Sequence, residues 1–67
     1  MRKVDLHGIK HADVPKVIIN CCVSWDTPFV VITGNSIAMK RIVKDTAKQF
    51  GLSVRDSFEN PGRVVVS

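Results

Sequence analysis

Apolar residues recur along this chain with two different periods, and the change between them limits the folds that it can adopt. Residues 3–6 alternate polar and apolar side chains, which is the period of a half-buried strand. Twice further on, apolar residues fall at i, i+3, i+4, i+7, i+8 and i+11, which places them along one side of a helix. The pattern therefore predicts short strands alternating with two amphipathic helices. The first helical stripe contains Val14, Val17, Ile18, Cys21, Cys22 and Trp25, and the second contains Met39, Ile42, Val43, Thr46, Ala47 and Phe50.

Capping residues mark the ends of the two helices. Asp13 is a suitable N-cap for the first helix, and Pro15 is tolerated in its first turn. Ser36 or Asn35 can cap the second helix, and Gly51 can follow its end as the C′ residue. These signals place one helix before and one helix after a continuous apolar strand of low exposure, Phe29-Val30-Val31-Ile32.

Two more strands follow the second helix. Residues 52–55 predict a third strand that extends as far as Phe58 at most, residues 60–62 (Asn-Pro-Gly) predict a turn, and residues 63–66 predict a fourth strand. Two right-handed crossovers would make the first three strands parallel and the last strand antiparallel, with both helices on one face. We therefore expect a single domain over residues 1–67, an α/β two-layer sandwich of order β-α-β-α-β-β with a four-stranded mixed sheet.

The composition fits one small globular domain. A chain of about 60 residues buries only roughly 60% of its unfolded surface, so its core is thin and a homodimer that covers a sheet face would be favourable. Apolar residues make up 45% of the chain, but the longest apolar run is only the four residues of 29–32, far below the length of a membrane span. Residues 1–3 (Met-Arg-Lys) do not lead into the apolar segment of a signal peptide. No membrane partner is expected.

The two cysteines indicate the compartment. Cys21 and Cys22 are adjacent, and neighbouring cysteines rarely form a disulfide because of its Cα separation. They are not part of a C-x-x-C motif, which argues against a structural zinc site. We expect two reduced thiols in a cytoplasmic protein.

The net charge favours a polyanionic partner. Ten lysines and arginines against six acidic residues give +4, which attracts phosphate over long distances. The charge by itself is weak support for nucleic-acid binding.

Polar residues end both of the first two strands. Strand one ends in Asp5-Leu6-His7-Gly8, and strand two ends in Thr33-Gly34-Asn35-Ser36. Because the carboxyl ends of parallel strands lie at one edge of a sheet, we expect the two segments to share a rim. The second segment leads into a helix N-terminus, where free N–H groups and the helix dipole attract a phosphate. The sequence therefore predicts a phosphate-binding rim that also carries a carboxylate and a histidine.

Each feature of this rim also has a purely structural interpretation. Asp5 could cap a turn or pair with Lys3 or Arg41, and His7 could be an ordinary strand-end residue. The T-G-N-S loop could be only a well-capped helix start. The basic face of the second helix is most often just solvated, and His11 is expected to be exposed near the first helix. Trp25 and Phe58 could stack on a base, but we expect Trp25 to cover the core at the end of the first helix and Phe58 to pack near the hairpin.

These motifs, in this order, resemble the Smr domain, the small MutS-related module. The resemblance rests on D-L-H-G at residues 5–8, on an apolar strand that ends in Thr33-Gly34, and on N-x-G at residues 60–62 before an apolar strand. It covers nearly the whole chain, and D-L-H-G in this position is the most specific of the three motifs. It implies an α/β sandwich similar to the carboxy-terminal domain of bacterial translation initiation factor three, with the last strand inserted between strands two and three.

The resemblance also implies a function. Smr domains bind DNA or RNA, and several are endonucleases that nick DNA or cleave RNA, including messenger RNA on stalled ribosomes. The acid and histidine of their D-x-H motif carry the activity and would correspond to Asp5 and His7. Asp5 could orient His7 or hold a divalent ion, Mg²⁺ or Mn²⁺, although one carboxylate alone is a poor metal site. The expected contacts to phosphate or nucleic acid come from Gly8, Thr33, Gly34, Asn35, Ser36, Lys40, Arg41 and Arg63.

Three functions remain open from the sequence. The leading one is an endonuclease that acts on RNA or on branched or double-stranded DNA. The second is a nucleic-acid-binding module without catalysis, because the loop reads T-G-N-S where the family usually has H-G-x-G. The third is a protein-interaction adaptor that uses an exposed sheet face.

Overall fold

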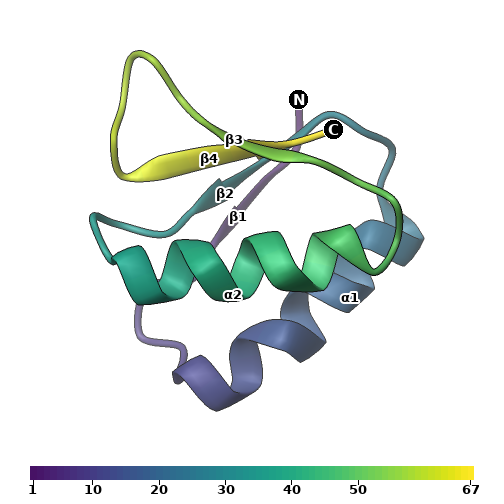
Figure 1. Cartoon of the computed structure of the whole chain (residues 1–67), viewed down its shortest axis with the longest axis horizontal. Coiled ribbons are helices and arrows are strands. Elements are labelled where there is room, and N and C mark those ends of the chain that lie inside the picture. Colours follow the sequence, from purple (N-terminus) through teal and green to yellow (C-terminus); the bar gives the residue numbers. More distant parts are fainter.

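The computed structural model of the protein describes all of residues 1–67 and contains one four-stranded sheet with both helices on one side of it (Figure 1). The strand order is β1-β2-β4-β3; β1 is parallel to β2, and β4 is antiparallel to both of its neighbours. The predicted fold class and strand directions are thereby confirmed, and β4 lies between β2 and β3. The elements are β1 (Lys3–Asp5), a short 3₁₀ helix η1 (His11–Asp13), α1 (Val14–Ser24), β2 (Phe29–Ile32), α2 (Ile37–Lys48), β3 (Val54–Asp56) and β4 (Arg63–Val66).

The strand register separates the two faces of the sheet. Val31 lies between Val4 on β1 and Val64 on β4, and all three side chains point toward the helices. The neighbouring row, Asp5, Ile32 and Arg63, points to the opposite face, which no helix covers. The open face of the sheet therefore carries apolar and charged side chains side by side.

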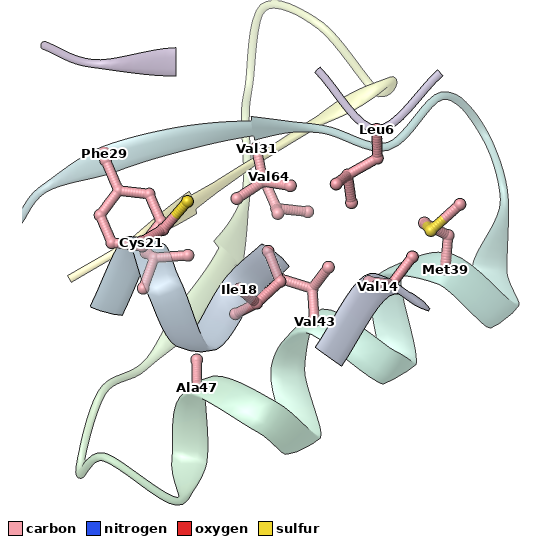
Figure 2. Close-up of a cluster of buried hydrophobic side chains, with 11 residues drawn as sticks. Leu6, Val14, Ile18, Cys21, Phe29, Val31, Met39, Val43, Ala47 and Val64 are labelled. Carbon is pink, nitrogen blue, oxygen red and sulfur yellow. The ribbon is translucent and has the colours of Figure 1, made fainter. Parts of the chain in front are cut away.

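Eleven buried residues form one hydrophobic core between the sheet and the helices (Figure 2). Both predicted helical stripes contribute to it, and the most central side chains are fully inaccessible to solvent. Trp25 packs against the edge of this core as expected, with its ring 5.5 Å from that of Phe29 in an edge-to-face geometry. The eleven are Leu6, Val14, Ile18, Cys21, Phe29, Val31, Met39, Val43, Ala47, Val64 and Val66.

The ends of α2 follow the sequence signals closely. The Ser36 hydroxyl accepts a hydrogen bond from the Met39 N–H at 3.1 Å, which confirms Ser36 as the N-cap. At the other end, the Gly51 N–H donates to the Lys48 carbonyl and the Leu52 N–H to the Ala47 carbonyl. This is a Schellman motif with Gly51 at C′ and a φ of 73°.

One local prediction was confirmed only in part, and two were wrong. Asp13 occupies the N-cap position of α1 as predicted, but it has helical dihedral angles and makes no side-chain capping bond, because the 3₁₀ helix η1 runs directly into α1. The third strand begins at Val54 rather than Leu52, because the Leu52 N–H is already used in the Schellman motif. Phe58 does not pack near the hairpin; it is fully exposed in the loop between β3 and β4.

Candidate functional site

The two predicted halves of the rim lie around one hollow. Asp5, His7, Ile32, Thr33 and Gly34 line a space of about 230 Å³ at the carboxyl ends of β1 and β2. The parallel pairing of these strands, with Asp5 opposite Ile32, is what brings the two segments together. The site hypothesis required this proximity, since residues 5 and 33 are distant in the sequence.

Asp5 has a structural role in this hollow. Its carboxylate accepts a hydrogen bond from the backbone N–H of His7 at 2.9 Å. The turn closes one residue later, where the Ile9 N–H donates to the Leu6 carbonyl at 3.0 Å and Gly8 takes a φ of 78°. Asp5 therefore caps the turn, and it forms no ion pair, because the one salt bridge in the chain joins two other residues. Its second carboxylate oxygen has no protein partner.

The His7 side chain is exposed and has no hydrogen-bond partner in the protein. Its backbone, by contrast, is held by Asp5, so the ring projects from a fixed turn. Both ring nitrogens are available to a ligand. This arrangement suits a group that donates or accepts a proton.

The T-G-N-S loop is held by the turn that precedes β4. The N–H groups of Thr33 and Gly34 both donate to the Gly62 carbonyl at 2.9 Å, and the Thr33 hydroxyl donates to the Gly34 carbonyl at 2.8 Å. The Gly62 N–H in turn donates to the side-chain oxygen of Asn60 at 2.9 Å. A Cβ at position 62 would lie 3.2 Å from the Asn60 side-chain oxygen, which is a tight contact, and 3.5 Å from the Gly34 Cα, which is an ordinary one. The N-P-G turn at residues 60–62 therefore holds the T-G loop at residues 33–34 in place.

Sequence reasoning missed this role of residues 60–62, which it interpreted as a turn before the last strand and as one motif of the resemblance. The signal that could have found it is the position of the motif: Gly62 comes directly before β4, and β4 pairs with β2. The turn must therefore lie beside the end of β2, where Thr33 and Gly34 are.

The free backbone donors of the rim lie slightly further along the chain than expected. The Gly34 N–H is occupied by the Gly62 carbonyl, while the N–H groups of Asn35, Ser36, Ile37 and Ala38 make no hydrogen bond. They form the start of α2, where the helix dipole favours an anion. The donors suited to a phosphate are thus the amides of residues 35–38, while those of the predicted contacts Thr33 and Gly34 are already occupied.

The predicted basic contacts divide between two places. Lys40 turns toward the β3–β4 loop, where its ammonium group donates to the Pro61 carbonyl and lies 3.4 Å from the Asp56 carboxylate. Arg41 is exposed in a groove between α2 and β3. Only Arg63 lies on the same sheet face as Asp5. It is in the same row, two strands away, so the usual strand spacing separates the Cα atoms of the two residues by roughly 10 Å.

The chemistry of the rim includes no preformed metal centre. No three His, Cys, Asp or Glu side chains cluster anywhere in the structure. Mg²⁺ or Mn²⁺ at Asp5 would need substrate oxygens and water for the rest of its coordination shell. The two cysteines lie away from the hollow, and burial raises the pKa of both thiols, which keeps them protonated.

Comparisons of the chain with protein-family models, with curated proteins and with solved structures gave no match. Neither helix is both long and apolar enough to cross a bilayer.

Proposed function

We propose that the protein binds nucleic acid at the rim formed by β1, β2 and the start of α2, and that it cleaves the phosphodiester backbone there. The observation that carries the proposal is the shared hollow of Asp5, His7, Thr33 and Gly34. A proton-transfer group, a carboxylate and a row of free backbone donors are the parts that such a cleavage requires.

The roles of the residues follow from their positions. With RNA, the His7 imidazole takes the proton of the ribose 2′-hydroxyl, whose oxygen attacks the adjacent phosphorus. The 5′-oxygen of the next nucleotide leaves and takes a proton from water. The free amides at residues 35 and 36 stabilise the charge that builds on the phosphate oxygens. Asp5 holds the turn that orients His7, and its negative charge stabilises the imidazolium.

The Smr assignment belongs to this proposal as well. It is supported by the D-L-H-G motif at residues 5–8 and by the contact between the T-G and N-P-G motifs. The position of β4 between β2 and β3 is also the arrangement that the resemblance to the Smr domain and to the carboxy-terminal domain of initiation factor three implies.

A second candidate is a binding module that does not cleave. It is favoured by the loop, which lacks the histidine usual in the family, and by the single carboxylate of the hollow. This module would use the same amides for phosphate and would gain affinity from Arg63 on the adjacent sheet face.

The test is cleavage of single-stranded RNA and of supercoiled plasmid DNA by purified protein, with Mg²⁺, with Mn²⁺ and with a chelator. We expect Asp5→Asn and His7→Gln to lose cleavage, while His11→Gln retains it. His11 is the matched control, because it is the other histidine and lies exposed in η1, outside the hollow. Cleavage that persists equally in Asp5→Asn and His7→Gln would exclude this site. A salt-sensitive mobility shift without products would select the binding module.

A further inference from the structure

A second surface, distinct from the hollow that Asp5 and His7 line, runs between α2 and the edge strand β3. A groove of about 300 Å³ lies there, with Ile37, Val54 and Val64 as its apolar residues. It continues into a hollow of about 230 Å³ toward the end of α2, and the two share Lys44 and Val54. We refer to the two together as the α2–β3 groove. None of its residues lines the hollow of the rim.

The groove is strongly basic. Four of its cations, Lys40, Arg41, Lys44 and Lys48, come from α2, and a fifth comes from β3. The only carboxylate of its lining is Asp56, which is paired with Lys40. The remaining cations have no acidic partner in the protein, so the groove as a whole attracts negative charge.

The strand beside the groove has an unpaired edge. β3 is the last strand in the sheet order, so β4 is its only neighbour. Ser53 exchanges two hydrogen bonds with Ser67 on that neighbouring side, at 2.8 and 2.9 Å, and the Ser57 N–H also donates toward it. Since strand residues alternate in direction, Val54 and Asp56 point their N–H and C=O groups away from β4, and none of these groups has a partner.

We propose that the α2–β3 groove binds an extended acidic peptide segment of a partner protein, which adds to the sheet as a fifth strand along β3. The backbone of such a segment supplies the alternating donors and acceptors that Val54 and Asp56 lack. Alternate side chains of the segment point to opposite faces of the sheet, so the acidic ones meet the cations of α2 on the helix side and the apolar ones lie on the open face, in the row of Arg55 and Val65.

The same edge fits the alternative occupants less well. A nucleic-acid chain does not present N–H and C=O groups that alternate at the spacing of a strand, which is what the free groups of Val54 and Asp56 require. If a second copy of this chain paired along β3, its Arg55 and its α2 cations would lie against the same cations of the first copy, and the like charges would repel each other. An acidic peptide therefore satisfies both the hydrogen-bonding groups and the charge.

The probe is a fluorescein-labelled peptide of alternating glutamate and valine, eight residues long and blocked at both ends. Asp56→Pro removes the outward N–H and blocks the edge, while Asp56→Ala keeps that N–H and loses the same carboxylate. Because the Asp56 N–H is not used inside the sheet, neither variant disturbs the pairing with β4. We expect Asp56→Pro to bind the probe about tenfold more weakly than Asp56→Ala, and Lys44→Glu to weaken it also.

A second measurement does not depend on the proline variant folding. In the wild-type protein, nuclear magnetic resonance should show the amide protons of Val54 and Asp56 becoming protected from exchange when the glutamate–valine peptide is added. The same peptide methylated on alternate backbone nitrogens should bind more weakly.

Equal affinity of Asp56→Pro and Asp56→Ala, with no protection of the two amides, would overturn the proposal. So would equal binding of a lysine–valine peptide of the same length. An eight-nucleotide single-stranded RNA that binds as tightly and protects the same amides would overturn it in favour of nucleic acid. The outcome is independent of the rim, because Asp5→Asn and His7→Gln should bind the peptide like the wild type.

Discussion

Substitution of Asp5 can separate its structural role from a chemical one. The Asp5 carboxylate accepts the His7 N–H at 2.9 Å in an exposed turn, and it makes no other hydrogen bond or ion pair. Asp5→Ala removes this acceptor, and the net loss for a hydrogen bond of this kind is about 1 kcal/mol of unfolding free energy. For a domain of this size, that loss lowers the Tm by about 4–8 °C. Asp5→Asn keeps an oxygen in the same position, so its unfolding free energy should change by less than about 0.5 kcal/mol.

The two variants share the loss of the negative charge and differ only in the turn. We therefore expect urea denaturation to distinguish them, while both lose nuclease activity. Equal destabilisation by alanine and asparagine would refute the assignment of the hydrogen bond as the stabilising contact. Full activity of a stable Asp5→Asn protein would show that Asp5 serves the turn alone, and it would remove Asp5 from the mechanism.

Three other predictions test the fold. Phe29→Ala should lower the unfolding free energy by about 3–5 kcal/mol. A domain of this size is expected to have about 3–10 kcal/mol in all, so Trp25 fluorescence should report an unfolded protein. A folded variant with a small change in Tm would contradict the packing. Phe58→Ser should change the unfolding free energy in urea by less than about 0.5 kcal/mol, since the ring is fully exposed; a loss of about 2 kcal/mol would mean that Phe58 packs after all. Burial raises the pKa of the Cys21 and Cys22 thiols, so the unfolded chain releases these protons at a lower pH than the folded chain does. The unfolding free energy should therefore be constant below the ordinary thiol pKa of about 8.5 and should fall as the pH rises above it. The loss should be absent from a variant with both cysteines replaced by alanine, in denaturation curves measured on either side of that pH.

Much of the fold could be predicted because its signals are local. Each helical stripe can be recognised from the spacing of apolar residues over only a few turns. The Ser36 cap and the Gly51 end also depend on residues within one turn of the helix. The shared rim of Asp5 and Thr33 followed from one topological rule about parallel strands, and the hollow between them agrees with it.

The features that sequence reasoning missed depend on contacts between distant segments. Nothing near Gly34 indicates that its N–H is already bonded, because the acceptor, Gly62, is reached only through the register of β2 with β4. The direction of Lys40 likewise depends on a loop that lies 21 residues away. The missing capping bond of Asp13 has a local reason, since η1 continues into α1 and supplies the backbone turn that a side-chain cap would otherwise provide.

The position of β4 has a consequence for synthesis of the protein. β4 follows every other element in the chain and yet fills the middle of the sheet, so β3 has no partner until it arrives. A ribosome-bound or truncated chain that stops before Arg63 would leave one edge of the apolar strand β2 unpaired, and unpaired strand edges are sites at which chains associate. Such a chain would also lack the Gly62 carbonyl that holds the T-G loop. The rim should therefore take its final shape only after β4 has been made.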